Sequence, residues 1–356
     1  MPSFSTFLTL GALLLGLAAC KKDSTSSSSR SLAYTTVSTL AGTGTDGFTD
    51  GAANVARFSY PDGAAVDAQG NVYIADAGNS SVRKITPAGV VSTLAGAGWP
   101  GLVNGTGSNA QFYDPADVVL DGQNNVYVAD FTNNCIRKIT PAGVVSTWAG
   151  SSTGGLVDGP AATARFRGPN GLAIDARGTL YVADGFNHCI RKITAAGVVS
   201  TLAGTGVAGY ADGPGSTAQF SRPEGLAVDA QGTLYTADYG DNRIRKITAA
   251  GVVSTLAGTG KVGYADGPGN TAMFFYPTGI AVDAQGTVYV ADLVNNCIRM
   301  ITPSGVVSTL AGTTALGFAN GPVASAKFSS PTGLTIDTNG ILYVTEQQNY
   351  IRKIAP

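Results

Sequence analysis

The sequence predicts an all-β fold, a six-bladed β-propeller of 54-residue repeats, and three observations support this prediction. First, a segment reading V-S-T-L-A-G, or V-S-T-W-A-G in one copy, recurs at a constant interval and begins at Val37, Val91, Val145, Val199, Val253 and Val307. Second, β-prone runs and Gly-containing turns alternate inside each repeat, which indicates four antiparallel strands per repeat. Third, the two ends of the chain carry complementary parts of one repeat.

The complementary ends predict that the ring is closed by the N-terminal strand. The first V-S-T-L-A-G segment, Val37–Gly42, has no I-R-K-I segment before it, and the last I-R-K-I, Ile351–Ile354, has no V-S-T-L-A-G after it. A solenoid would need atypical capping repeats at its ends instead. We therefore predict that Val37–Gly42 completes the last blade, beside Gly333–Asp337, Ile341–Thr345 and Ile351–Ile354. This pairing would leave no open strand edge.

The repeat also resembles a known family. Each copy carries a proline followed two residues later by glycine in five of the six, a hydrophobic run that ends in Asp, and a segment close to L-Y-V-A-D-x-x-N-x-x-I-R-K-I. This pattern resembles the NHL repeat, whose Asn-His pair is kept best at Asn187-His188. The resemblance covers residues 32–356 and implies a six-bladed β-propeller. It implies little about function, because members include binding domains, sensor domains and enzymes.

The first 31 residues have a different character. The apolar run Phe7–Ala19 is shorter than the roughly 20 residues that span a bilayer, and it fits a signal-peptide core. It ends in Leu17-Ala18-Ala19-Cys20, which resembles the bacterial lipobox. We expect a lipoprotein signal peptide (1–19), a lipidated Cys20 with a serine-rich tether (20–31) and the propeller (32–356). The alternative is an ordinary cleaved signal. The lipidated form would be anchored at the outer membrane of the bacterial cell envelope, on the periplasmic side or at the cell surface.

Composition limits the partners. The formal net charge is −1 and the Lys and Arg residues follow the repeat spacing, so nucleic acid is not an expected partner and we expect a monomer. Cys135, Cys189 and Cys297 occupy one repeat position. Equivalent points on adjacent blades lie about 10 Å apart, whereas a disulfide needs Cα atoms within about 7 Å. We predict three free, buried thiols. A single histidine rules out a His-rich zinc site.

The two ends of the predicted blades differ. Short, uniform turns such as Ala68-Gln69-Gly70 join the first and second strands and the third and fourth strands at one end, here called the turn face. The D-x-x-N turns, such as Asp130–Asn133, and long inter-blade loops, such as Thr43–Arg57, lie at the other end, here called the loop face. Because long loops on a rigid scaffold often carry binding sites, we place any site on the loop face.

The candidate site comes from positions that differ among the six copies. If the first strand is innermost, the residues around its initial proline rim the central channel on the loop face. The predicted binding residues are Asp62, Asp117, Asn170, Glu224, Thr278 and Thr332 after the proline, and Tyr60, Arg222 and Tyr276 before it. No catalytic residue and no cofactor are predicted, although Ca²⁺ held by the oxygen ligands of Asp62, Asp117 and Glu224 is an open alternative.

Residues kept in every copy are interpreted as structural. The aspartates that close the first strands, such as Asp67, should cap backbone N–H groups of the following turns. The repeated arginines, such as Arg83, should pair with carboxylates or carbonyls where blades meet, with a polyanion-binding ring as the alternative. The apolar loop residues, such as Phe48, should anchor their loops, although stacking on sugars is also open.

Three functions are considered. The first is a membrane-anchored, non-enzymatic binding module that presents the loop face to a glycan, peptide or protein. The near-identity of the blades favours it, because an active site usually makes one or two blades depart from the rest. The alternative is a metal-dependent hydrolase or lyase that uses the acidic residues of the channel rim. The third is a structural spacer without a ligand.

Overall fold

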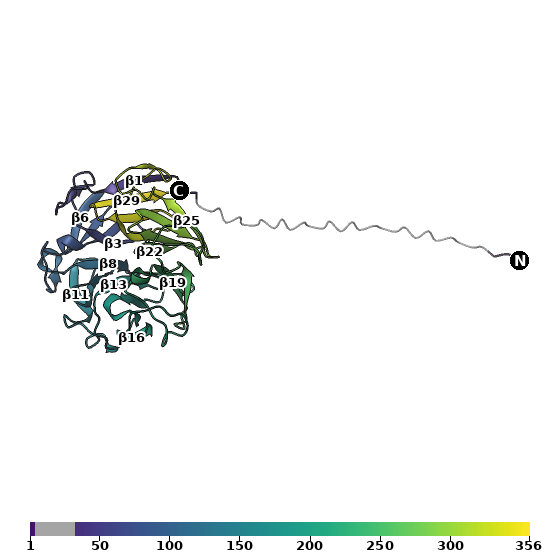
Figure 1. The fold of residues 1–356 in the computed structure, drawn as a ribbon, viewed down its shortest axis with the longest axis horizontal. Coiled ribbons are helices and arrows are strands. Elements are labelled where there is room, and N and C mark those ends of the chain that lie inside the picture. The colour runs from purple at the N-terminus through teal and green to yellow at the C-terminus, as the bar shows by residue number, and fades with distance from the viewer. Residues whose placement is uncertain (4–32) are drawn as a thin grey trace. The chain divides into compact units, whose positions relative to one another are not determined.

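The computed structural model describes residues 1–3 and 33–356 of the chain. The predicted signal peptide, Cys20 and the tether lie outside the described residues, apart from the first three positions. Ala33–Pro356 forms one compact unit of six antiparallel sheets arranged in a ring. In Figure 1 the inner strands β3, β8, β13 and β22 lie near the middle of this unit, and β6, β11 and β16 lie at its edge. The predicted six-bladed propeller is confirmed.

Each blade contains four antiparallel strands, which follow the sequence order from the channel outward in blades 1 to 5, whereas in blade 6 the outer strand is the N-terminal β1. The innermost strands are β3 (Pro61–Val66), β8 (Pro115–Leu120), β13 (Pro169–Ile174), β17 (Pro223–Val228), β22 (Pro277–Val282) and β27 (Pro331–Ile336). The second strands are β4 (Val72–Asp76), β9 (Val126–Asp130), β14 (Leu180–Asp184), β18 (Leu234–Asp238), β23 (Val288–Asp292) and β28 (Leu342–Glu346). The third strands are β5 (Ser81–Ile85), β10 (Cys135–Ile139), β15 (Cys189–Ile193), β19 (Arg243–Ile247), β24 (Cys297–Ile301) and β29 (Tyr350–Ala355). We number the blades 1 to 6 from β3 to β27.

The outer strands carry the V-S-T-L-A-G segments. They are β6 (Val90–Ala95), β11 (Val144–Gly150), β16 (Val198–Ala203), β20 (Val253–Ala257), β25 (Val306–Ala311) and β1 (Thr36–Ala41). Five sheets gain a two-residue edge strand that the sequence analysis missed: β2 (Gly51–Ala52), β7 (Gly105–Thr106), β12 (Gly159–Pro160), β21 (Gly267–Pro268) and β26 (Gly321–Pro322). In blade 4 the equivalent contact is the single bridge between Gly213 and Val253. The inter-blade loop therefore pairs with the outer strand of the blade that it enters.

Helical structure in the described residues is limited to single 3-10 turns. These are η1 (Ala77–Asn79), η2 (Gly107–Asn109), η3 (Gly185–Asn187) and η4 (Tyr239–Asp241). Three of them form D-x-x-N turns. Over residues 1–3 and 33–356, no helix has the length and apolar character needed to cross a membrane.

The ring is closed as predicted. Strand β1 pairs antiparallel with β29, with Thr36 opposite Ala355 and Val37 opposite Ile354. The fully buried side chain of Val37 packs in the apolar core between blades 5 and 6. Just before β1, the Tyr34 hydroxyl donates a hydrogen bond to the Tyr289 hydroxyl at 3.2 Å. The first and last strands thus belong to one sheet.

The apolar core is divided among the interfaces between blades. Each interface buries one repeated phenylalanine, and all six are fully buried: Phe58, Phe112, Phe166, Phe220, Phe274 and Phe328. The three cysteines of the propeller are free and buried, as predicted. Because the sheet faces pack against neighbouring blades, the free edges of the innermost strands face the channel.

A polar network surrounds each repeated arginine. Arg83 Nη1 donates to Asp76 Oδ2 at 2.7 Å, and Nη2 donates to Asp50 Oδ1 at 2.6 Å and to the Thr49 carbonyl at 2.8 Å. Its guanidinium lies 4.9 Å from the centre of the Phe48 ring. All six arginines are fully buried. The structural interpretation of the arginines is confirmed, and the loop residue Phe48 covers a guanidinium, as expected of a loop anchor.

The aspartates after the first strands cap their turns, as predicted. Asp67 Oδ1 accepts the backbone N–H of Gln69 at 3.0 Å and that of Asn71 at 2.8 Å. Its other oxygen accepts the Tyr73 hydroxyl at 3.2 Å. Oxygen Oδ1 accepts the same two N–H groups in each of the other five blades. These carboxylates are used by the scaffold.

Candidate functional site

Two adjoining cavities occupy the propeller axis. The channel cavity, of about 330 Å³, is lined by five residues from every innermost strand: 62–66, 116–120, 170–174, 224–228, 278–282 and 332–336. The mouth cavity, of about 240 Å³, lies on the loop face and includes side chains from the D-x-x-N turns. Both are lined by the residue that follows the initial proline of each innermost strand. This ring of six residues therefore separates the channel from its mouth.

Glycine follows that ring because the blades approach closely there. A Cβ atom on Gly171 would lie 2.0 Å from the Glu224 carbonyl oxygen, and one on Gly225 would lie 2.1 Å from the Thr278 carbonyl oxygen. No side chain fits at such distances. The five glycines at this level allow neighbouring innermost strands to pack against each other, which fixes the width of the channel.

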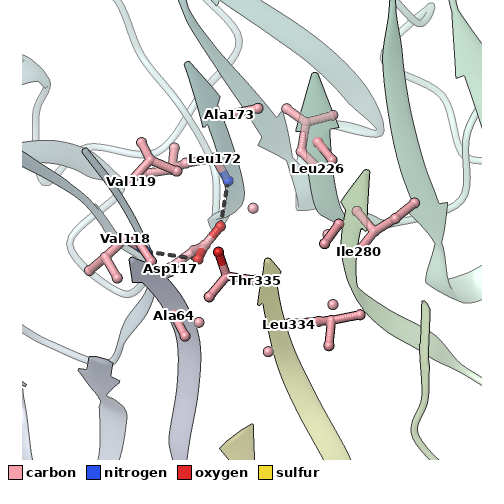
Figure 2. Close-up of a pocket in the computed structure, with 18 of the residues that line it drawn as sticks. Ala64, Asp117, Val118, Val119, Leu172, Ala173, Leu226, Ile280, Leu334 and Thr335 are labelled. Atoms are coloured by element: carbon pink, nitrogen blue, oxygen red, sulfur yellow. Dashed lines mark hydrogen bonds between the residues drawn. The ribbon is translucent and has the colours of Figure 1, made fainter. Parts of the chain in front are cut away.

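Blade 2 is the exception, with Asp117 in place of glycine. Its bulge is shorter, so that Asp117 pairs with Ala129 in β9. The carboxylate accepts the backbone N–H of Val118 at 2.8 Å and that of Leu172, in blade 3, at 2.8 Å. Figure 2 shows both hydrogen bonds. Burial raises the pKa of Asp117 to about 7, against the lowering effect of the two N–H donors.

Two further acids lie at the mouth. Burial raises the pKa of Glu224 to about 7, and Arg222, whose Nε lies 3.2 Å from Glu224 Oε1, opposes the rise. The pKa of Asp62 is raised well above its usual value by burial and then by the charges of Glu224, Asp117 and Asp114. These acids therefore share one electrostatic environment although they come from different blades.

The predicted threonines have a different use. Thr278 Oγ1 donates to the Thr332 carbonyl in the next blade at 3.0 Å. Thr332 Oγ1 donates to the Pro61 carbonyl at 3.1 Å and lies 2.9 Å from Thr345 Oγ1. Both side chains line the mouth, but their hydroxyls connect adjacent blades. Asn170 also lines the mouth, and its side chain makes no hydrogen bond with the described part of the chain.

The residues before the proline adopt the left-handed conformation, with φ of 47° at Tyr60, 56° at Arg222 and 54° at Tyr276. The backbone N–H before the proline donates to the side chain of a left-handed residue at the start of the third strand's hairpin in the preceding blade, which directly follows the D-x-x-N turn in all but blade 6. The pairs are Tyr60 with Asn349, Gly168 with Asn134, Arg222 with His188, Tyr276 with Asn242, and Ser330 with Asn296. Of the three predicted residues, Arg222 lines the mouth cavity, and Tyr60 and Tyr276 do not.

The sequence analysis missed a group of aromatic residues in the D-x-x-N turns. Phe131 and Tyr239 line the mouth cavity. Phe131 packs edge to face on Phe186 at 5.4 Å, and the Tyr239 ring stacks on Tyr276 at 4.5 Å. The Arg222 guanidinium lies over Phe186 and Tyr239, 5.3 Å and 4.9 Å from their ring centres. The two middle positions of this turn vary among the copies, so the criterion that selected the rim residues could also have found them.

The predicted calcium ligands come from blades 1, 2 and 4. Over residues 1–3 and 33–356, no group of three or more His, Cys, Asp or Glu side chains is close enough to hold a metal ion. The Asp117 carboxylate is turned to the N–H groups of Val118 and Leu172. The acids of the rim therefore share a cavity without forming a coordination site.

Two family models match parts of the chain. The model described as "SMP-30/Gluconolactonase/LRE-like region" matches residues 117–262. The NHL repeat model matches residues 58–85 and 274–299.

Curated relatives are similar over most of this chain but extend well beyond it. Protein SUPPRESSOR OF QUENCHING 1, chloroplastic, from Arabidopsis thaliana is 29% identical over 74% of this chain and 27% of its own length. NHL repeat-containing protein 2 from Bos taurus is 28% identical over 83% of this chain and 46% of its own length. The chain thus spans less than half of the length of these relatives.

Solved structures share the fold at low sequence identity. An auxiliary nutrient binding protein from Bacteroides thetaiotaomicron has a TM-score of 0.70 and 16% identity, covering 90% of this chain and 76% of its own. A gluconolactonase from Xanthomonas campestris has a TM-score of 0.59 and 14% identity, covering 90% and 89%. A catalytically inactive histidine-to-alanine variant of virginiamycin B lyase from Staphylococcus aureus, with quinupristin, has a TM-score of 0.53 and 14% identity, covering 90% and 99%. Parts of this chain are therefore similar to the NHL repeat and to the SMP-30/gluconolactonase/LRE-like region, and the solved structures share its β-propeller fold.

Proposed function

We propose that this chain is a non-enzymatic binding module that holds a group of a glycan, peptide or protein partner in the mouth cavity of the loop face. The proposal rests on one observation: residues that differ among the six blades come together at this mouth. Phe131, Arg222, Glu224 and Tyr239 come from positions that vary from copy to copy, yet they line one cavity. The buried arginines and phenylalanines of the scaffold are instead the same in every blade.

The chemistry of the mouth suits a polar ligand with an apolar face. Aromatic rings offer flat surfaces, and Arg222 already lies over two of them, so the site can hold a planar or cationic group. Acids with a pKa near 7 can donate or accept a proton in a hydrogen bond at neutral pH. The structural similarity to an auxiliary nutrient binding protein agrees with a binding role.

A second candidate is the metal-dependent hydrolase or lyase that uses the acidic residues at the rim of the central channel. It is favoured by the pKa of about 7 at Asp117 and Glu224, because general acid–base catalysis works best near the operating pH. The lyase among the structural neighbours loses its activity when a histidine is replaced. The one histidine of this chain, His188, lines neither cavity, and its Nδ1 accepts the Arg222 N–H at 3.1 Å. We therefore rank binding first.

We further propose that the protein is a monomer, lipidated at Cys20 and anchored at the outer membrane of a bacterial cell envelope. The support is the lipobox-like segment Leu17-Ala18-Ala19-Cys20 after an apolar run. Replacing Cys20 by Ala should move the protein from the membrane fraction to the soluble fraction and abolish the incorporation of labelled palmitate. Retention of the label in this variant would contradict lipidation.

Binding can be tested with substitutions that copy one blade into another. Tyr239→Ala installs the residue that blade 1 carries as Ala77, and Arg222→Ser installs the Ser330 of blade 6. Glycan and peptide arrays would identify ligands of the wild-type protein, and calorimetry would measure their affinity. Each variant should lose about tenfold or more in affinity with an unchanged melting temperature.

Gln231→Ala, in a turn of the opposite face, is the matched control and should bind like the wild type. Equal affinity in Tyr239→Ala and Arg222→Ser would move the site away from the mouth. Lactone or glycan turnover by the wild type that is lost in Glu224→Gln would favour the enzyme instead.

A further inference from the structure

One groove of the turn face departs from the repeat. It lies between blades 2 and 3 and has a volume of about 570 Å³. Two of its residues are exceptions at their repeat positions. Trp148 stands where the other five outer strands carry leucine, and Arg177 stands where the other turns carry glutamine or asparagine. These residues are distant in sequence but line the same groove. The prediction that this face is uniform is wrong at this place.

The equivalent groove between blades 1 and 2 is an internal reference. It has a volume of about 170 Å³ and is lined by Leu94, Tyr73, Lys84 and Pro141. In the larger groove Tyr127 and Lys138 are kept, whereas Trp148 replaces the leucine and Ala195 replaces the proline. The groove between blades 2 and 3 is therefore wider and carries a large ring.

The backbone fixes the position of Trp148. Ile136 pairs with Ala149 and Arg137 pairs with Thr147, so Trp148 is the extra residue of a β-bulge, which turns its side chain out of the regular ladder. Its ring packs edge to face on Tyr127 at 5.1 Å. Trp148 is half-buried, and its indole N–H has no acceptor among the described residues.

Of the two cations of the groove, Arg177 is exposed, whereas Lys138 is half-buried over a tyrosine ring. Asp175 accepts hydrogen bonds from the backbone N–H groups of Arg177 and Thr179, each at 2.9 Å. Asp121 accepts the equivalent hydrogen bonds from Gln123 and Asn125. The Lys138 ammonium lies 5.3 Å from the centre of the Tyr127 ring. The exposed guanidinium of Arg177 has neither an ion pair nor a side-chain hydrogen bond within residues 33–356.

We propose that this groove binds a saccharide unit that bears a carboxylate, such as a hexuronic acid residue. The indole face stacks on the apolar face of the sugar ring, and the indole N–H donates to a hydroxyl. Arg177 binds the carboxylate with two parallel N–H donors, a geometry that lysine does not provide. Gln123, in the same groove, supplies an amide for further hydroxyls. The volume is that of a ligand site.

Intrinsic fluorescence tests this proposal directly. The sequence has two tryptophans, so a Trp99→Phe background leaves Trp148 as the only reporter. Titration with trigalacturonate should give a saturable change in the emission of Trp148. The neutral trisaccharide of galactose should bind with an affinity at least about tenfold lower. Calorimetry should show that Arg177→Gln and Trp148→Leu each weaken trigalacturonate binding about tenfold or more.

Both substitutions install the residue that other copies carry, so the melting temperature should stay unchanged. Glu224→Gln, at the mouth of the opposite face, should bind trigalacturonate like the wild type, which separates this site from the proposed function. Equal affinity for the neutral trisaccharide, or unchanged affinity in Arg177→Gln or Trp148→Leu, would overturn the proposal. Loss of trigalacturonate binding in Glu224→Gln would contradict the placement of the site in this groove.

Discussion

The arginine networks and the mouth cavity are built from the same repeat, but they differ in whether their polar side chains have hydrogen-bond partners within the protein. In every blade the buried arginine donates to a carboxyl group of the second strand and to a side-chain oxygen of the inter-blade loop. At the mouth, Asp62 and Asn170 line a cavity without a side-chain hydrogen bond in the described chain, and the residues differ from blade to blade. The repeated arginines are thus used by the scaffold, whereas the varied positions of the mouth include side chains, such as those of Asp62 and Asn170, that the scaffold does not use.

The largest effect should come from removing the closing strand. Deleting residues 34–42 takes β1 out of blade 6 and exposes β29, so the whole propeller should lose its cooperative thermal transition near the wild-type temperature. Deleting residues 24–31, in the serine-rich segment, should leave the transition unchanged. Circular dichroism and calorimetry would measure both. Wild-type melting after loss of residues 34–42 would refute closure by β1.

The next effect concerns one arginine of the networks. Arg137→Leu leaves the buried Asp130 carboxylate without its cation, 2.7 Å from Arg137 Nη1 in the wild type. The free energy of unfolding should fall by about 3–5 kcal/mol. The exposed Arg177→Gln should change it by less than about 0.5 kcal/mol. Denaturant titration would compare the two variants, and similar small changes in both would contradict a structural role for the network.

A comparison of pH profiles between the wild type and Glu224→Gln should isolate the contribution of this mouth acid to stability. The pKa of Glu224 is raised to about 7 in the folded protein, above the value near 4.3 in an unfolded chain. The folded state therefore binds the Glu224 proton more tightly than the unfolded chain does. The stability that protonated Glu224 contributes is full below about pH 4 and is lost as the pH rises to about 7. Glu224→Gln should make the unfolding free energy fall less steeply over this range, by up to about 1.4 kcal/mol per pH unit. An unchanged slope would contradict the raised pKa.

The smallest expected effect is on stability and comes from adding a hydrogen bond at the junction of blades 1 and 2, which lacks one that the other five junctions have. Five junctions have a hydrogen bond from a backbone N–H before the proline to the side chain of the left-handed residue just before the third strand of the preceding blade. No such bond joins Asp114 to Ser80 in the described structure. Ser80 is already in the left-handed conformation, with φ of 47°. Ser80→Asn should add the bond and raise the free energy of unfolding by about 1 kcal/mol, measured by denaturant titration.

Most of the fold could be predicted because six copies of the repeat carry the same pattern of strands and turns. The missing halves of one repeat predicted the pairing of β1 with β29, and hydrophobic periodicity predicted the four main strands. The edge strand β2 could not be predicted, because Gly51–Ala52 is too short to carry a strand pattern. Its pairing depends on where the loop meets β6, which is a tertiary contact.

The candidate site was predicted only in part, for reasons that particular residues show. Variation among copies identified Asp62 and Glu224, which line the mouth. It could not reveal that the Thr278 hydroxyl is used by the neighbouring blade, because the partner is a backbone carbonyl. Asp117 was expected on the rim, but a shorter bulge turns its carboxylate to the Leu172 N–H below the mouth. Phe131 and Tyr239 were missed because the comparison of the copies was confined to the residues around the initial proline and did not include the middle positions of the D-x-x-N turns.

The pairing of β1 with β29 has a consequence for biosynthesis. Strand β1, which a ribosome makes first in this domain, finds its partner only when β29 has been made. Until then blade 6 lacks its outer strand, and incomplete chains keep two unpaired strand edges that can associate with other chains. A pairing between such distant segments also slows folding, because the loop that closes is almost the whole domain. Synthesis of β29 is thus the event that permits closure of the propeller.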